Sequence, residues 1–124
     1  MKVQMKVSPK IIIDINADEM TTVFEEIANA QEILGICECG KCKSQNIRYV
    51  VREDSEANKY YEMRCQDCFA KIAFGLNKKG GGMFPKLKEN TDEDKCLMGG
   101  AVQPGAYLPD KGWLKWDKEK NCNV

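Results

Sequence analysis

Two pairs of cysteines carry the strongest chemical signal in this sequence. Cys39 and Cys42 form one C-x2-C pair, Cys65 and Cys68 form a second, and twenty-two residues separate the pairs. Two intervening residues let the chain turn so that both sulfurs of a pair face one ion, and four thiolates at about 2.3 Å make a closed tetrahedral site that suits Zn²⁺. The spacing therefore predicts a structural Zn²⁺ site with Cys39, Cys42, Cys65 and Cys68 as ligands.

Other uses of these thiols stay open at this point. The alternatives are a redox-active dithiol or iron centre, and thiols that bind no metal. The chain contains no histidine, which excludes Ser-His-Asp and Cys-His catalysis. A catalytic zinc needs an open coordination position, and four cysteine ligands leave none. We therefore expect a protein that is not an enzyme.

The remaining three cysteines have no partner at ligand spacing. Cys37 precedes the first pair and either replaces Cys39 as a ligand or adds negative charge beside the site. Cys96 and Cys122 are expected to be ordinary small side chains or exposed thiols.

The residues between and after the cysteine pairs are basic and aromatic. The 124 residues have a formal net charge of zero, but residues 37–88 hold an excess of five positive charges, whereas 1–36 and 89–124 are acidic by three and two. Cations bind phosphates and aromatic faces stack on unpaired bases, so this mixture favours single-stranded DNA as the partner. The candidate nucleic-acid-binding residues are Arg48, Arg52, Arg64, Lys71, Lys78, Lys79, Lys86 and Phe84.

A protein partner is the alternative to nucleic acid. Aromatic residues on a hairpin often form its own core, and exposed lysines are common on any surface. Trp113 and Trp116 can likewise belong to the core or form a platform for stacking or docking. This alternative describes an adaptor or inhibitor that docks on another protein through the N-terminal helix or the tryptophan pair.

The elements that position the cysteines follow from the hydrophobic periodicity. Residues 46–53 alternate with the period of a strand, the polar residues 54–59 predict a turn, and residues 60–64 and 70–74 predict two further strands. This hairpin brings the two cysteine pairs together. The Gly-rich residues 78–82 predict a basic loop, and residues 89–105 predict a surface excursion.

The N-terminal segment predicts a strand followed by an amphipathic helix. Residues 11–15, four of them isoleucines, form a β-branched stretch of strand length that should pair with another strand. Asn16 and Glu19 suggest a capping box, apolar residues then recur at helical spacing to Leu34, and Gly35 ends the helix. The predicted fold is α+β: a strand-helix unit (1–36), a three-stranded antiparallel sheet clasped by a four-cysteine zinc site (37–88), and a loop-rich C-terminal segment (89–124) packed on it.

Residues 37–116 resemble the small zinc-ribbon proteins encoded by bacteriophages and prophages of Gram-positive bacteria. The resemblance rests on the two knuckles, the hairpin between them, and the runs at residues 60–68, 70–75, 78–81, 84–86 and 112–116. It implies zinc ligation by the four cysteines, the host-cell cytoplasm, and a part in phage DNA replication or recombination. Ribbon knuckles usually have glycine after the second cysteine, where φ is positive, but here Lys43 and Phe69 stand there, which predicts local strain.

No membrane segment is evident from the residue pattern. The longest apolar run is Ile11–Ile13, far below the roughly 20 residues that a membrane-spanning helix needs. Residues 1–4 begin no apolar secretory signal, so we expect a cytoplasmic protein with reduced thiols. The function that these expectations favour is a structural-zinc protein that binds single-stranded DNA.

Overall fold

The structure, a computed structural model, describes residues 1–77, 82–88, 96–97 and 107–124. Over these residues the chain is α+β, with antiparallel sheets and one helix. Its residues group into two compact units, the first comprising Met1–Cys37 and Leu76–Phe84 and the second Glu38–Gly75 and Pro85–Val124. The predicted domain boundaries at residues 36 and 88 stay a prediction.

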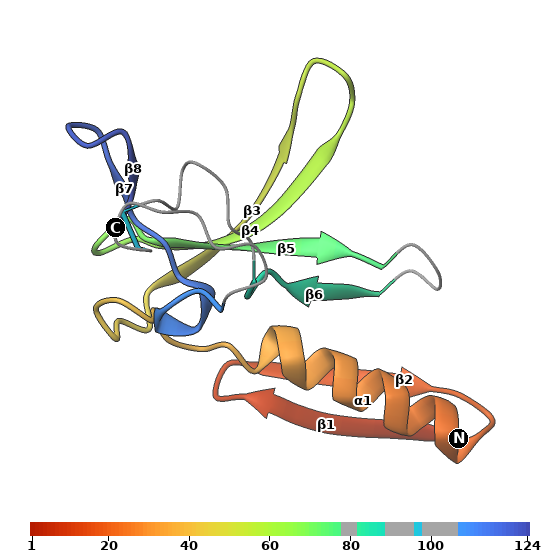
Figure 1. Ribbon diagram of the computed structural model, residues 1–124. Coiled ribbons are helices and arrows are strands. Elements are labelled where there is room, and N and C mark those ends of the chain that lie inside the picture. The colour runs from red at the N-terminus through yellow and green to blue at the C-terminus, as the bar shows by residue number, and fades with distance from the viewer. Residues whose placement is uncertain (78–81, 89–95, 98–106) are drawn as a thin grey trace. The chain divides into compact units, whose positions relative to one another are not determined.

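The first unit is a strand hairpin with a helix against it (Figure 1). Strands β1 (Lys2–Ser8) and β2 (Ile11–Asn16) pair antiparallel, and α1 (Met20–Leu34) contacts both. The prediction of one N-terminal strand was therefore incomplete, because residues 2–8 supply the partner that β2 needs. Ile15, Val23 and Ile33 are its buried hydrophobic residues.

The helix begins later than the capping-box prediction placed it. Asn16 is the last residue of β2, where it pairs with Lys2, so it cannot cap the helix. Glu19 occupies the N-cap position and makes no side-chain capping hydrogen bond. At the other end, Gly35 follows the helix as predicted, and its N–H donates to the carbonyl of Gln31 at 3.1 Å.

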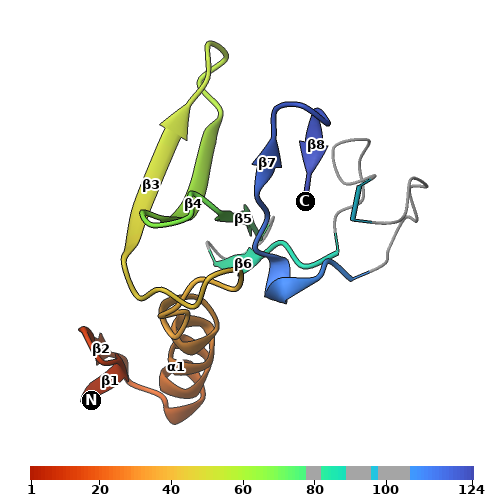
Figure 2. The same ribbon diagram turned by 90° about the vertical axis from the view of Figure 1, so that its left-hand side faces the viewer.

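The second sheet has four strands in the order β3-β4-β5-β6. The predicted hairpin and third strand are confirmed as β3 (Ile47–Glu53), β4 (Lys59–Cys65) and β5 (Lys71–Leu76), and β6 (Met83–Pro85) adds a short fourth strand. Figures 1 and 2 show the far end of the β3–β4 hairpin extending beyond β5. One face of this sheet carries the buried residues Met63, Ile72 and Phe74, which alternate with more polar neighbours.

The C-terminal segment is attached to the second sheet through β5. Leu114 and Lys71 form an antiparallel bridge, each N–H donating to the other carbonyl at 2.8 Å. The 3₁₀ turn η2 (Asp110–Gly112) precedes this bridge, and the short hairpin of β7 (Trp116–Asp117) and β8 (Cys122–Asn123) follows it.

The expectations that Cys96 and Cys122 are ordinary small side chains or exposed thiols, and that the thiols are reduced, were wrong for this pair. Cys122 is fully buried and forms a disulfide with Cys96. This bond links β8 to residue 96, which precedes the η2 turn in the chain. A separation of 26 residues in the sequence gave no local signal for this pair.

Candidate functional site

The two cysteine pairs lie on turns with the same backbone hydrogen bonds. In the first turn, Cys39 N–H donates to the carbonyl of Ser44 at 2.8 Å, and Lys43 N–H donates to that of Cys39 at 3.0 Å. In the second turn, the corresponding bonds join Cys65 to Ala70 at 2.8 Å and Phe69 to Cys65 at 3.1 Å. We call these two turns the knuckles (39–44 and 65–70). They are equivalent structures that precede and follow the β3–β4 hairpin in the chain.

The four knuckle sulfurs converge on one point. All four ligand atoms lie within 4.8 Å of one another. The Cys39–Cys68 sulfur pair is 3.6 Å apart and the Cys42–Cys65 pair is 3.5 Å apart. A tetrahedral Zn²⁺ with bonds of about 2.3 Å needs sulfur-sulfur separations of about 3.8 Å. The donor set and its spacing therefore fit a zinc ion, and the prediction that these four cysteines cluster is confirmed.

The surroundings of the cluster act differently on its four thiols. Lys41 N–H donates to the sulfur of Cys39 at 3.3 Å, and Cys68 N–H donates to that of Cys65 at 3.5 Å. Burial opposes the thiolate of Cys65, but the amides of Cys68 and Asp67 and the neighbouring thiols lower its pKa to about 7. Burial, together with the other thiols, raises the pKa of Cys68 to about 12. A bound metal therefore has to displace protons from part of this set.

Contacts outside the ligand set hold the two knuckles in place. The hydroxyl of Ser44 donates to the carboxylate of Asp67, which joins the first knuckle to the second. Gly40 lies directly against Trp113, since a Cβ at Gly40 would come within 2.6 Å of the indole. Lys41 forms an ion pair with Asp110 at 2.6 Å. Trp113 and Asp110 of the C-terminal segment thus contact the first knuckle directly.

Four of the predicted nucleic-acid-binding cations share one face of the second sheet. Arg48 pairs with Arg64 across β3 and β4, and Arg64 pairs with Lys71 across β4 and β5. Residues that pair in an antiparallel ladder point to the same face, and so does Arg52, four residues along from Arg48. We call Arg48, Arg52, Arg64 and Lys71 the basic face.

A buried carboxylate lies in the middle of the basic face. Glu62 accepts hydrogen bonds from Arg52 at 2.9 and 3.3 Å and from Arg64 at 2.9 Å. Lys71 Nζ lies 3.6 Å from its other oxygen, and the Glu62 side chain is only 3% exposed. Burial opposes the charged form, but the two arginine hydrogen bonds and the charge of Lys71 hold the pKa of Glu62 below its ordinary value. One carboxylate thus orients three cations and offsets only one of their three positive charges.

The remaining predicted nucleic-acid-binding residues are Lys78, Lys79, Phe84 and Lys86. Lys78 and Lys79 lie outside the described residues. Phe84 is 40% exposed on β6 and groups with the first unit. Lys86 is half-buried after β6, and its N–H donates to the carbonyl of Ala73 at 2.9 Å. Their assignment to a nucleic-acid site stays a prediction.

The two tryptophans have different environments. Trp113 is 1% exposed and belongs to the core of the second unit, whereas Trp116 is 42% exposed. Sequence reasoning left both options open for the pair; the core option is correct for Trp113, and a stacking or docking platform at Trp116 stays a prediction. It missed Glu62 altogether, although the two-residue period of β4 places Glu62 on the same face as Arg64. It also missed the exposed ring of Phe69 beside the second cysteine pair.

Comparison of the chain with protein-family models, with curated proteins and with solved structures gives no match. Among the described residues, no helix is long and apolar enough to cross a membrane.

Proposed function

We propose that this chain is a zinc-ribbon protein that binds single-stranded DNA through its basic face. The observation that carries the proposal is the presence of four cations on one face of β3–β5, with Glu62 as the only acidic residue on that face of these strands, all of which the structure describes. Arg52, Arg64 and Lys71 remain 48%, 43% and 41% exposed despite their ion pairs, so they can still meet phosphates.

Zinc has a structural part in this proposal. When bound by the four cysteines, the ion fixes both knuckles and therefore the two chain ends of the β3–β4 hairpin, and such a site can contribute on the order of 10 kcal/mol to folding. The pairing of Arg64 with Arg48 depends on that hairpin, and its pairing with Lys71 depends on the second knuckle, which joins β4 to β5. A closed set of four thiolates leaves no position for a substrate, which is why we propose binding rather than catalysis.

Single strands are favoured over duplexes because aromatic rings accompany the cations. Tyr60 pairs with Arg52 on the basic face, is 40% exposed, and has the guanidinium 5.1 Å from its ring centroid. Unpaired bases can stack on such rings, whereas the bases of a duplex are already stacked. Phage replication or recombination in the host cytoplasm, which the sequence resemblance implies, is a setting in which single strands occur.

The direct test is a binding titration of the zinc-loaded protein with labelled single- and double-stranded oligonucleotides over a range of salt. We expect the single strand to bind more tightly and the logarithm of its affinity to fall linearly with the logarithm of salt concentration. Salt-independent affinity, or no binding to either oligonucleotide, would contradict the proposal.

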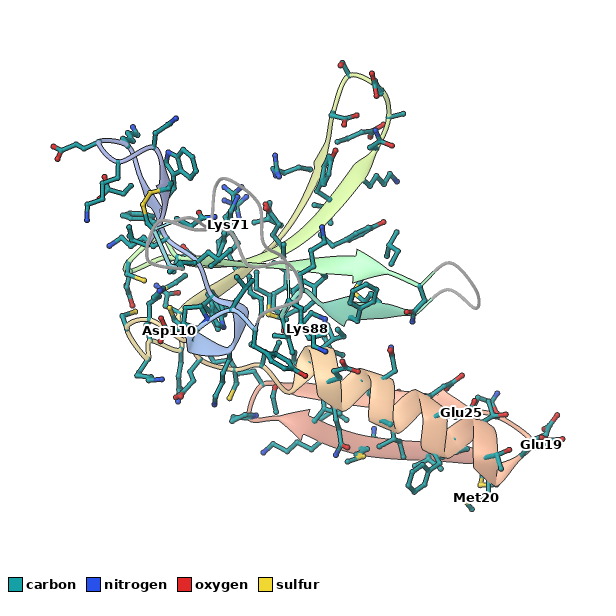
Figure 3. All side chains as sticks on the ribbon, viewed as in Figure 1. Glu19, Met20, Glu25, Lys71, Lys88 and Asp110 are labelled. Carbon is teal, nitrogen blue, oxygen red and sulfur yellow. A yellow bond between two sulfur atoms is a disulfide. The ribbon has the colours of Figure 1, made fainter. Side chains whose placement is uncertain are left out.

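A protein-docking function is the second candidate, and a feature of α1 favours it. Met20 and Phe24 are 63% and 74% exposed and lie one helical turn apart; Figure 3 shows Met20 at the start of the helix. This function describes an adaptor or inhibitor acting on a host or phage replication, transcription or defence protein. A protein captured from nuclease-treated host lysate by the wild type, but not by a Met20→Ser/Phe24→Ser variant, would support it.

A further inference from the structure

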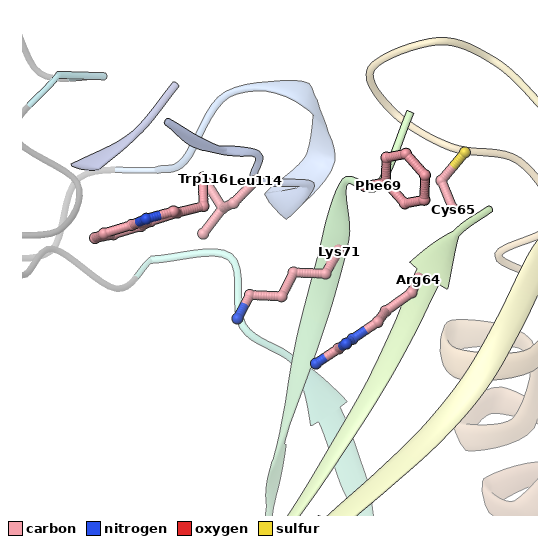
Figure 4. Close-up of a pocket in the computed structure, with 6 residues that line it drawn as sticks. All are labelled: Arg64, Cys65, Phe69, Lys71, Leu114 and Trp116. Carbon is pink, nitrogen blue, oxygen red and sulfur yellow. The ribbon is translucent and has the colours of Figure 1, made fainter. Parts of the chain in front are cut away.

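A pocket of about 220 Å³ opens beside the basic face, where β5 meets the C-terminal segment. Figure 4 shows its lining, with the side chains of Arg64 and Lys71 extending in the same direction. Trp116 lies on one side of Lys71, and Phe69 lies on the other. The pocket thus combines two cations with two aromatic rings, and Leu114 and Cys65 complete its wall.

The backbone determines which tryptophan faces this pocket. The bridge between Lys71 and Leu114 places their side chains on the same side of the sheet. Side chains alternate along an extended segment, so Trp116 shares that side and Trp113 faces the core. The exposures of 42% and 1% agree with this alternation. The bridge of Leu114 to Lys71 in β5 therefore places Trp116 beside the cations.

Two features of the pocket are suited to a ligand. The knuckle turn gives Phe69 a φ of 66°, as it gives Lys43 a φ of 64°, and the ring of Phe69 is left 79% exposed, so it offers an uncovered aromatic face. The Nε of Arg64 is buried and has no hydrogen-bond partner among the described residues. Both features are expected where a ligand supplies the missing stacking surface and the missing acceptor.

We propose that this pocket binds one nucleotide of the single strand, with its base stacked on Trp116 and its phosphate bound by Arg64 and Lys71. The inference rests on the proposed function and adds to it a defined subsite. The basic face contributes charge along the strand, and the pocket contributes recognition of a base. Phe69 covers the other side of the bound nucleotide.

The test compares an ordinary oligothymidylate with an abasic strand of the same length, which keeps the phosphates and lacks the bases. The proteins are the zinc-loaded wild type and the Trp116→Ala, Trp116→Phe and Phe24→Ala variants, the last removing an exposed ring from α1. We expect the wild type to prefer the ordinary strand, and Trp116→Ala to reduce this preference by about 5- to 150-fold, the range for one base stack. Trp116→Phe should keep most of it, and Phe24→Ala all of it. A titration with thymidine monophosphate alone shows whether the pocket also binds a free nucleotide or binds a nucleotide only within a strand.

The outcomes separate the subsite from the function on which it rests. If Trp116→Ala keeps the wild-type preference and the same salt dependence, the pocket proposal is wrong while binding through the basic face stands. If the wild type binds the ordinary and the abasic strand equally but with strong salt dependence, the pocket proposal is again wrong and binding through the basic face again stands. Absence of any binding by the wild type contradicts both proposals. Tryptophan fluorescence gives an independent readout, because quenching by the strand should disappear in Trp116→Phe, which retains Trp113.

Discussion

Lys43 and Phe69 occupy the same place in the two knuckles, each one residue after the second cysteine and each with a positive φ, of 64° and 66°. This is the position at which a glycine is expected, and the strain inferred from the sequence is confirmed by the backbone. The chain keeps the knuckle geometry with two residues in the left-handed region, each about 1 kcal/mol or more above a relaxed conformation. The convergence of the four sulfurs therefore outweighs the local preference of the backbone.

Glycine at either position should stabilise the protein. For Lys43→Gly and Phe69→Gly we expect a gain of about 1 kcal/mol each in the free energy of unfolding, because glycine adopts positive φ without steric cost. Urea denaturation of the zinc-loaded variants measures this. Gln66→Gly, in the same knuckle at a position without positive φ, is the control and should lose stability. Destabilisation by both knuckle glycines would show that the strain argument is wrong.

Replacing Glu62 should have opposite effects on stability and on DNA binding. Glu62→Gln weakens the hydrogen bonds to Arg52 and Arg64, so we expect a loss of about 1 to 2 kcal/mol in the free energy of unfolding, reduced by the exposure of the cations. It also removes a negative charge from the basic face, which should raise the affinity for single-stranded DNA about threefold at low salt. A fall in affinity in a folded variant would contradict the role given to this face.

The pH dependence of stability should report the same carboxylate. Because the folded state lowers the pKa of Glu62 below its ordinary value of 4.5, its contribution is present above that value and is lost as the pH falls through the folded pKa. The wild type should therefore lose stability faster than Glu62→Gln as the pH falls below about 4.5, when the two are compared by thermal denaturation. Parallel curves would show that Glu62 does not contribute in this way.

The salt dependence of binding should locate the phosphate contacts. Replacing Arg48 and Arg52 together by glutamine should reduce the slope of log affinity against log salt by about 1 to 1.5, since each phosphate contact on a single strand contributes about 0.7. The charge-matched control is Lys2→Gln/Lys6→Gln in β1, which should leave the slope unchanged. Equal changes in the two double variants would indicate a general charge effect instead of a binding face.

The contact of Gly40 with Trp113 should be intolerant of any side chain. A Cβ at Gly40 would collide with the indole and with the carbonyl of Asp110, so Gly40→Ala should cost about 1 to 3 kcal/mol of stability. Gly82→Ala is the matched control, because the nearest atom to its Cβ is the end of the Asn77 side chain, which can move. Similar stabilities of the two variants in a thermal denaturation experiment would argue against close packing at the first knuckle.

Local patterns predicted much of the second unit. The alternation of residues 46–53, the polar turn and the return strand correspond to β3 and β4, and the C-x2-C spacing corresponds to the observed sulfur cluster. These features depend on neighbours in the sequence or on one hairpin, so periodicity and spacing were sufficient to find them.

Long-range pairing accounts for what the sequence did not predict. The disulfide between Cys96 and Cys122 and the bridge between Lys71 and Leu114 join segments far apart in the chain. No periodicity marks such contacts, and the second of them decides which tryptophan is exposed. The pairing of β2 with β1 similarly took Asn16 into a ladder and away from the helix cap. Tertiary pairing overrode a local capping signal there.

Zinc analysis tests the central claim most directly. The protein should be purified without added metal, and its zinc content and native mass measured for the wild type and for Cys65→Ser. We expect one Zn²⁺ per wild-type chain, with Cys39, Cys42, Cys65 and Cys68 protected from alkylation, and loss of both the metal and the fold in the variant. A folded, metal-free wild type with four freely alkylated thiols in these positions would contradict the account.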